Sequence, residues 1–441
     1  MNGLPDWEWY DDGLPWLPIK PVSVMLETQP TLFFGEILII TFAVISFFHA
    51  VAHGRQHVLI WFTSVITGTA NDIFFMVLPF VDNFFHAQCT IMLTPRLPLY
   101  IPCAYIAFVY SSTVTVWRLR LPMFAQSAAS GLLGGLFYCI YDLIGAKYLW
   151  WTWHDTDAAI SERWLGVPIG STMWTIVHCF CFTALIDALV LWKPRLSLVD
   201  CAKTTLFSAL LTTPLMMLCM APFQLHQLRV SFTTMQVTQM PGRPDGLALA
   251  AAIAAFLMIL LGSDETVPAS RMKWLSPRRQ WDRLLAMICV VYCVGLVLLM
   301  ALGHPEDVIA TGVHQLYGEC GVVEEDLSGY PRYAFLCRED YHEDYRVPEV
   351  KGTTTTTSEE AAGGGAGHVI LCGRKTGPLV PREVPPKVGS SWYTLCGKAH
   401  SDYHRWVTTE TVLALLCAVL YSAILFSTTA EKTQKKKSKS D

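Results

Sequence analysis

Charged residues are scarce in this chain. They make up 15% of its 441 residues, whereas hydrophobic residues make up 52%. A chain of this length and composition is too apolar for several water-soluble domains and too long for one small core. The composition therefore predicts a multi-pass membrane protein.

Several motifs with recognisable chemistry are absent as well. The sequence has no P-loop, GxGxxG, GxSxG or HExxH, so nucleotide binding and hydrolytic triads have no support in it. It has no CxxC spacing and no adjacent pair of histidines, which weakens a metal site. We expect no metal, no cofactor and no nucleic-acid partner.

Apolar runs long enough for a hydrocarbon layer of roughly 30 Å occur at about nine places. They lie near residues 32–53, 59–80, 98–118, 125–145, 169–191, 204–224, 246–262, 284–302 and 408–427. The sequence therefore predicts an all-α integral membrane protein, a bundle of about nine transmembrane helices.

Lys and Arg gather between alternate runs and after the last one. They are Arg55; Arg118 and Arg120; Lys193, Arg195 and Lys203; Arg271, Lys273, Arg278, Arg279 and Arg283; and Lys432, Lys435, Lys436, Lys437 and Lys439. An odd number of spans puts all five groups on one side, which the positive-inside rule makes the cytosol. The N-terminus is then lumenal and the C-terminus cytosolic.

This topology divides the chain into five parts. They are a lumenal segment (1–31), an eight-helix bundle (32–302), a lumenal loop region (303–407), a ninth helix (408–427) and a basic cytosolic tail (428–441). The loop region contains Cys320, Cys337, Cys372 and Cys396, which predict two disulfides without choosing among three connectivities. Within it, residues 353–367 form a low-complexity linker.

The tail ends in KSKSD, which resembles the dilysine-type retrieval signal of endoplasmic-reticulum membrane proteins. The alternative is a generic basic tail attracted to anionic lipid. The resemblance implies residence in the endoplasmic reticulum.

Ionisable side chains at membrane depth are functional candidates, because each costs several kcal/mol unless it is paired or faces water. On this topology, polar residues gather in the lumenal half or at its rim: Glu36, Asn71, Asp72, Asp82, Asn83, His86, Asp142, His154, Asp155, Asp157, His178 and His226. This asymmetry predicts a polar cavity open to the lumen. For Asp72 and Asp142, the alternative is a buried hydrogen bond that fixes helix packing.

Two local patterns allow two interpretations each. The stretch LWWTWHDTD (149–157) is either an interfacial aromatic belt or the wall of a site, and three tryptophans in four positions favour the wall. His49, His53 and His57 follow one another at four-residue steps on one helical face, as a metal site or as a polar helix end. We favour the polar helix end.

Between the second and fifth runs, the chain resembles a family of uncharacterised animal multi-pass membrane proteins. The resemblance rests on the motifs DNFFHAQ (82–88), TPRLPLYIPCAY (94–105) and WWTWHDTD (150–157).

More remotely, the chain resembles the carotenoid hydratase family, whose sequences have Asp, then Trp-x-Trp, then Gly-Val-Pro before a span. The matching residues here are Asp142, Trp151, Trp153, Gly166, Val167 and Pro168. That family usually has an Asn soon after the Pro, where this chain has Ser171 and Thr172.

The second resemblance implies addition of water to an isoprenoid double bond. That reaction needs a carboxylic acid to protonate the alkene, aromatic faces to stabilise the carbocation, and a positioned water. The expected catalytic residues are Asp142, His154, Asp155, His178 and Asp72, and the expected substrate-binding residues are Trp151, Trp153, Asn71, Asp82, Asn83, His86 and Glu36.

We therefore expect an endoplasmic-reticulum membrane enzyme that hydrates or isomerises a double bond of a lipid or isoprenoid. Membrane lipids are its expected partners, and the sequence identifies no protein partner. The alternatives are a non-enzymatic lipid-binding protein, a transporter, or a structural subunit of a membrane complex.

Overall fold

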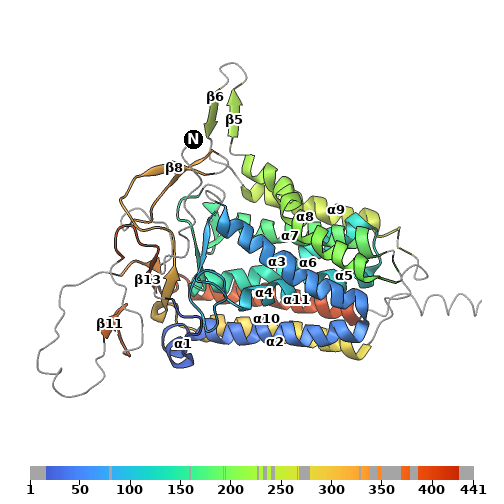
Figure 1. The fold of residues 1–441 in the computed structure, drawn as a ribbon, viewed down its shortest axis with the longest axis horizontal. Helices are drawn as coiled ribbons and strands as arrows, with labels where there is room; N and C mark the ends of the chain where they lie inside the picture. Colours follow the sequence, from blue (N-terminus) through green and yellow to red (C-terminus); the bar gives the residue numbers. More distant parts are fainter. Residues whose placement is uncertain are drawn as a thin grey trace, which may run out of the picture.

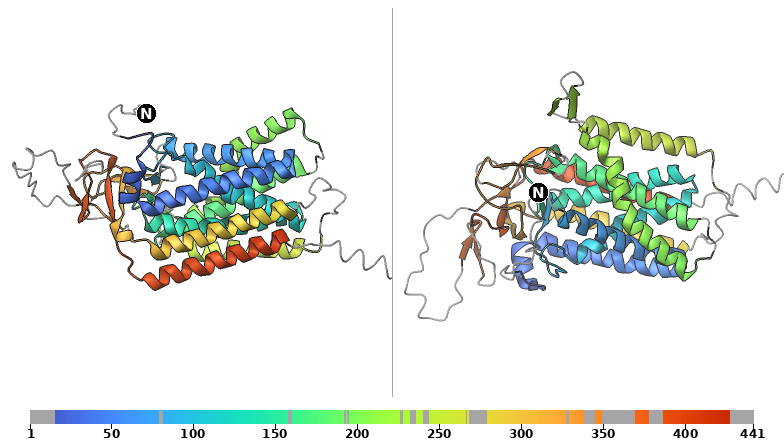
Figure 2. Two further views of the ribbon diagram at one scale, coloured as in Figure 1. Left: turned by 90° about the horizontal axis from the view of Figure 1, so that it is seen from below. Right: turned by 45° about the horizontal axis from the view of Figure 1, so that its top comes forward.

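A computed structural model of the chain describes residues 16–78, 82–157, 160–191, 193, 195–225, 228–231, 236–239, 244–265, 267, 279–326, 329–337, 345–348, 369–377 and 386–426. Long helices lie side by side in a bundle, and short strands gather at one end of it (Figures 1 and 2). We call this the strand end; α6 (Met123–Lys147) finishes there. The opposite end, where α11 (Tyr403–Phe426) finishes, is the tail end.

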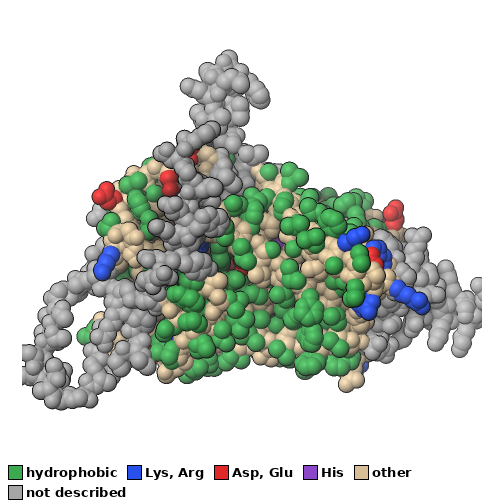
Figure 3. All heavy atoms as spheres, in the orientation of Figure 1, with side chains coloured by type: hydrophobic (Ala, Val, Ile, Leu, Met, Phe, Trp, Pro, Cys, Tyr) green, Lys and Arg blue, Asp and Glu red, His purple; other side chains and the backbone are tan. Residues whose placement is uncertain are grey.

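Eight helices of the described chain are long and apolar enough to cross a membrane. They are α2 (Pro30–His53), α3 (Arg55–Val77), α6, α7 (Ile169–Ile186), α8 (Leu198–Leu225), α9 (Pro244–Gly262), α10 (Arg279–Leu302) and α11. Figure 3 shows hydrophobic side chains covering the side of the bundle, with most of the visible Lys and Arg near the tail end. The length and hydropathy of these helices indicate an integral membrane protein.

The run expected at 98–118 takes a less regular form than a single α-helix. It consists of α4 (Tyr100–Tyr105), the π-helical turn η1 (Ile106–Tyr110), α5 (Ser111–Val116) and the 3₁₀ turn η2 (Trp117–Leu119). Every residue from Tyr100 to Trp117 except Cys103 is buried, so this composite helix lies inside the bundle. Its hydroxyl groups bond to neighbouring helices, as between Thr113 and Thr183 (2.9 Å).

Helices α6 and α7 cross closely at two glycines spaced four residues apart, Gly131 and Gly135. A Cβ atom on Gly131 would lie 2.7 Å from the carbonyl oxygen of Ile176, and one on Gly135 would lie 2.3 Å from Cγ1 of the same residue. Only glycine admits this approach, which places the end of α6 beside the start of α7.

The strand end is a layer of short strands, and an all-α fold is therefore wrong for this part. β1 (Phe84–His86) pairs with β2 (Trp151–Trp153), and β13 (Trp392–Gly397) pairs with β7 (Ile309–Val313) and β10 (Tyr345–Arg346). Four further hairpins join β3 (Arg163–Trp164) to β4 (Val167–Pro168), β5 (Leu228–Ser231) to β6 (Gln236–Gln239), β8 (Val323–Glu325) to β9 (Pro331–Tyr333), and β11 (Val369–Leu371) to β12 (Arg374–Thr376). Strands of two to six residues are too short to show a clear alternating pattern in sequence.

A short helix, α1 (Val22–Thr28), precedes α2 and leads into the bundle. Within the strand layer, the segment after β1 is bonded to β7: the backbone N–H of Gln88 donates to the carbonyl oxygen of Thr311 (2.9 Å). A 3₁₀ turn, η6 (Pro305–Asp307), connects α10 to β7. The expected linker at 353–367, the basic tail at 428–441 and His226 lie outside the described residues.

Two disulfides staple the strand layer, as the sequence predicts, and the structure selects their pairing. Cys320 bonds to Cys337, and Cys372 bonds to Cys396. The first bond closes the loop that carries the β8–β9 hairpin. The second ties the β11–β12 hairpin to β13.

Digestion of the unreduced protein should release one peptide pair linked through Cys320 and Cys337 and another linked through Cys372 and Cys396.

Because the second bond closes a loop of 24 residues, Cys372→Ser should lower the free energy of unfolding by about 3 kcal/mol. Chemical denaturation followed by tryptophan fluorescence measures this loss, with Cys219→Ser, at an exposed free thiol, as the control. Recovery of a Cys320–Cys372 peptide would contradict the pairing.

Candidate functional site

Three of the five expected catalytic residues lie inside the bundle near the strand end, around a shared set of aromatic rings. Asp72 comes from α3, Asp142 from α6 and His178 from α7, and all three side chains are buried. Each acid lies five residues before the end of its helix, at Val77 or Lys147, which is about 7.5 Å of helix rise. We call these three residues the acid–histidine centre.

Asp72 is held by a chain of hydrogen bonds across three helices. The phenol of Tyr105 donates to Asp72 Oδ1 (2.6 Å), and the amide of Asn71 donates to the same phenolic oxygen (3.1 Å). Thr213 of α8 donates to the carbonyl oxygen of the Asn71 side chain (3.0 Å). Asp72 Oδ2 has no hydrogen-bond partner among the described residues.

Asp142 has one firm partner. The hydroxyl of Ser171, in the first turn of α7, donates to Asp142 Oδ2 (2.6 Å), and the indole of Trp151 is a second polar neighbour. Within the described chain, no group forms a hydrogen bond of good geometry with Oδ1. Asp142 therefore resembles Asp72, with one oxygen bound and the other unsatisfied.

His178 stands among aromatic rings. Its imidazole stacks on Trp174 with ring centroids 5.2 Å apart and lies 5.7 Å from the ring of Tyr105. Neither ring nitrogen finds a hydrogen-bond partner in the part of the chain that the structure describes. Tyr138, one turn before Asp142 on α6, lies 6.4 Å from Trp174, so aromatic rings extend from His178 to the turn of α6 that carries Asp142.

Unsatisfied polar atoms are a feature that this centre shares with other buried positions of the described chain, such as Glu410 and His86. A buried polar atom without a partner costs roughly 1–3 kcal/mol, and nearly all such atoms in proteins are bonded. Here one oxygen of each acid and both nitrogens of His178 lack a bond from the described chain. Such a centre suits binding of a polar group or proton transfer.

The tryptophan stretch is not an aromatic belt at the membrane surface, because its side chains are buried. Trp150, Trp151 and Trp153 are 0%, 4% and 7% exposed. The ring of Trp151 lies 4.8 Å from that of Tyr141 and rests on Gly145, where a Cβ atom would come within 2.0 Å of it. Trp151 therefore lies between the strand layer and the acid–histidine centre.

The other two expected catalytic residues belong to the strand layer. The backbone N–H of His154 donates to the carbonyl of Asn83 (2.8 Å), and that of Asp155 donates to the side chain of Gln315 (2.9 Å). Their own side chains approach to 3.5 Å. None of their described contacts reaches the acid–histidine centre. The five expected catalytic residues therefore belong to two separate clusters.

Several expected substrate-binding residues have structural partners instead. Asp82 forms a two-pronged ion pair with Arg96 (2.5 and 2.7 Å). Glu36 accepts hydrogen bonds from the backbone N–H (3.1 Å) and hydroxyl (2.6 Å) of Thr90. His86 is buried with its ring 6.1 Å from that of Trp151, and neither nitrogen has a partner among the described residues.

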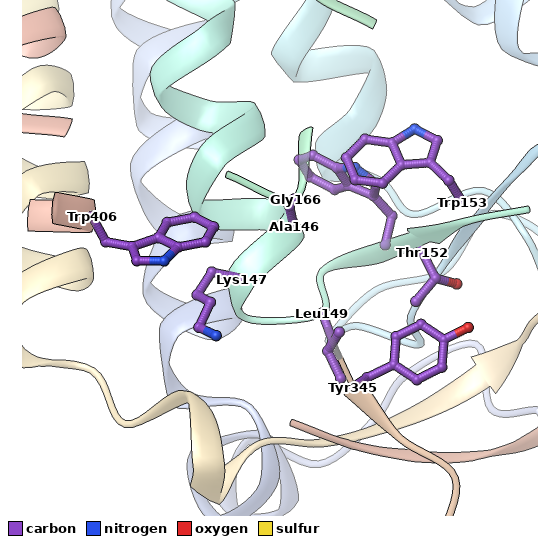
Figure 4. A pocket seen from close by; sticks show the side chains of 9 residues that line it. Ala146, Lys147, Leu149, Thr152, Trp153, Gly166, Tyr345 and Trp406 are labelled. Carbon is purple, nitrogen blue, oxygen red and sulfur yellow. The ribbon is translucent and has the colours of Figure 1, made fainter. Parts of the chain in front are cut away.

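The strand end also contains a small cavity of about 20 Å³. Figure 4 shows Lys147, Trp406, Tyr345 and Thr152 around it. The ammonium group of Lys147 donates to the carbonyl of Ala399 (3.1 Å) and lies 5.4 Å from the centre of the Trp406 ring. This volume suffices for one water molecule, and of the acid–histidine centre's neighbours only Trp151 lines it.

Sequence reasoning missed the aromatic residues that complete the centre. Tyr105 is the last residue of the motif at 94–105, and Trp174 precedes His178 by one helical turn. The four-residue step between Trp174 and His178 was the available signal. The pairing of Asp142 with Ser171 depends on the α6–α7 crossing, which spacing along the chain does not show.

Gly68→Ala should disrupt the Asp72 side of the centre. A Cβ atom on Gly68 would lie 2.0 Å from Cγ of Tyr105, so the ring must move away from Asp72. Overpacking of this kind costs about 1–3 kcal/mol, and thermal unfolding in detergent should report it. Gly246→Ala, where no atom lies within 4 Å, is the control; equal effects of the two substitutions would argue against the contact.

Acid should destabilise the strand layer. Burial lowers the pKa of His86, His154 and His314 from 6.5 to about 3. The unfolded chain therefore binds more protons than the folded chain between these values, and stability is lost as pH falls from about 6.5 toward 3. Burial raises the pKa of Asp155, so this carboxyl group favours the folded chain as pH falls. The three histidines outnumber it, and the net effect of acid is a loss of stability.

Near-ultraviolet circular dichroism against pH should show this loss, and the double variant His86→Asn, His314→Asn should shift the midpoint to lower pH. His404→Asn, at an exposed position, should leave the midpoint unchanged. An unshifted midpoint in the double variant would exclude these histidines as the cause.

Comparison with known proteins assigns the chain to a family. The family model described as "Domain of unknown function (DUF7802)" matches residues 16–376, a range that includes the acid–histidine centre and the motifs at 82–88 and 150–157. No curated protein and no solved structure matches the chain. The remote resemblance to carotenoid hydratases stays a prediction. Because the match spans most of the 441 residues, the chain belongs to the DUF7802 family.

Proposed function

We propose that this protein is a membrane enzyme that hydrates or isomerises a double bond of a lipid or isoprenoid at the acid–histidine centre. The supporting observation is that Asp72, Asp142 and His178 are buried around a shared set of aromatic rings, each with an unsatisfied polar atom. We place the protein in the endoplasmic reticulum with the strand end lumenal. The basic residues and the disulfides support that placement.

In the proposed reaction, Asp142 protonates the alkene. Its Oδ2 is held by Ser171, which leaves Oδ1 to act on a bound substrate. The rings of Tyr138 and Trp174 stabilise the resulting carbocation through their negative faces. In hydration, water adds to the cation and His178 takes the proton that the water releases. In isomerisation, His178 removes a proton from the neighbouring carbon.

The remote resemblance to carotenoid hydratases supports the same assignment. Two residues that carry it, Asp142 and Trp151, are neighbours in the structure. Ser171 stands where that family usually has an Asn, and it donates the hydrogen bond that orients Asp142. A hydroxyl in place of the amide keeps a hydrogen-bond donor at this position on a smaller side chain.

A substrate must reach the centre from the bilayer, and α8 is the helix best placed to move. Thr213 of α8 contacts Asn71 beside the centre, whereas only 33% of the membrane-crossing part of α8 is buried. In this proposal, displacement of α8 exposes the Asp72 side of the centre to lipid. An apolar substrate then enters sideways.

Lipids extracted from cells with and without the protein should differ by species that are hydrated or isomerised. At equal expression, Asp142→Asn keeps the shape of the side chain and removes the acid, so the change should fall by roughly 10²–10⁴-fold. Asp72→Asn should also reduce it. Asp155→Asn, in the strand layer, is the matched control and should retain the change.

A lipid change that persists in both Asp72→Asn and Asp142→Asn would refute the assignment of the acids. Identical lipids with and without the protein would refute the enzyme and leave the transporter. One observation favours proton-coupled transport as that second candidate: hydroxyl groups form a chain inside the bundle, from Thr183 to Ser130 (2.8 Å) and on to Ser112 (3.1 Å). Proton flux into vesicles that contain the purified protein separates the two functions.

A further inference from the structure

Two histidines and an aspartate meet at the tail end of the bundle. His49 and His53 lie one turn apart on α2, and Asp282 comes from the first turn of α10. The Nε2 atoms of His49 and His53 lie 3.4 Å and 3.1 Å from Asp282 Oδ1. The three side chains are 1% to 3% exposed, so this His–His–Asp cluster is shielded from solvent.

The helix break beside the cluster corrects the expected run of three histidines. α2 ends at His53 because Gly54 has a φ of 101°, and His57 lies in the first turn of the next helix, α3. The ring of His57 still lies 4.7 Å from that of His53. The turn at Gly54 therefore keeps a third imidazole next to the pair.

Hydrogen bonds to the other ring nitrogens orient both histidines. Nδ1 of His53 lies 2.9 Å from the carbonyl oxygen of His49, to which it donates, so its Nε2 carries a lone pair. Nδ1 of His49 lies 2.7 Å from the phenolic oxygen of Tyr110. When it donates there, both Nε2 lone pairs face Asp282. Histidines that bind metals are oriented by such bonds from their second nitrogen.

A positively charged side chain, Arg118, already lies beside the cluster. Nη2 of Arg118 lies 2.7 Å from Asp282 Oδ1 and 3.0 Å from Nε2 of His53. In the tautomer in which His49 donates to Tyr110, the lone pairs of both imidazoles face the carboxylate and repel it unless a positive charge lies among them. In that form the site suits a cation, and a guanidinium group meets that need from one side.

We propose that the His–His–Asp cluster binds a divalent transition-metal ion of the zinc type, which displaces the guanidinium group of Arg118. Two imidazole nitrogens and a carboxylate oxygen form a donor set that zinc and its neighbours bind, whereas calcium and magnesium prefer oxygen alone. The ligand atoms already lie within 4.8 Å of one another. A fourth position is left for water or His57.

The bound ion would join α2 to α10 at the tail end. Its site shares no residue with the acid–histidine centre, so the proposal does not depend on the proposed reaction. Exchange between Arg118 and the ion also gives a specific expectation: removal of the guanidinium group should strengthen metal binding, because the competitor is lost.

The test uses the full-length protein in detergent, loaded with Zn²⁺, passed through a desalting column and analysed for metal by mass spectrometry. The wild-type protein should retain about one ion more per chain than the double variant His49→Asn, His53→Asn, which measures binding at other residues. Competition with a chromogenic chelator should give Arg118→Gln an affinity at least about tenfold higher than wild type. His404→Asn, at an exposed position far along the chain, should match the wild type.

Thermal unfolding with and without Zn²⁺ provides a second readout that does not depend on any activity. Zinc should raise the unfolding temperature of the wild-type protein and leave that of the double variant unchanged. The proposal is overturned if wild type and Arg118→Gln retain no more zinc than the double variant. The cluster is then a closed ion pair between Arg118 and Asp282.

Discussion

Close contact between glycine and an aromatic ring is the constraint on which the acid–histidine centre depends. Gly35 lies against Trp150, Gly68 against Tyr105 and Gly145 against Trp151, each where a Cβ atom would come within 2.0 to 2.3 Å of the ring. Tyr105 reaches Asp72 because α3 is bare at Gly68. For the same reason Trp150 packs closely on α2 at Gly35 and Trp151 packs closely on α6 at Gly145. Small residues thus set the position of the large ones.

The sequence revealed the helices well and the strand layer poorly. Eight runs were long enough to emerge from hydropathy alone, whereas β10 and β7 have two and five residues and carry little pattern. The composite helix from Tyr100 to Leu119 was located, but its π-turn and its burial depend on the neighbours that surround it. Asp72, Asp142 and His178 stood out because charge is costly at membrane depth. His154 and Asp155 were grouped with them by adjacency to Trp153, which says nothing about the partners across the strand layer.

The two ends of the bundle treat buried polarity differently. At the tail end, Asp282 has partners in Arg118, His49 and His53, and the charges balance. Near the strand end, Asp72 and Asp142 each keep one oxygen unsatisfied within the described chain. A satisfied network holds helices in register, whereas an unsatisfied one raises the energy of the resting site and favours any ligand that completes it. The contrast supports the reaction proposed for the acid–histidine centre.

The second disulfide has a consequence for the position of Trp151. The bond between Cys372 and Cys396 joins β13 to the hairpin beside it, and β13 pairs with β7, which in turn bonds to the segment after β1. β1 pairs with β2 and so holds Trp151 over the acid–histidine centre. Reduction of this disulfide would release the β11–β12 hairpin from β13 and remove one tie of the layer that holds Trp151 in place.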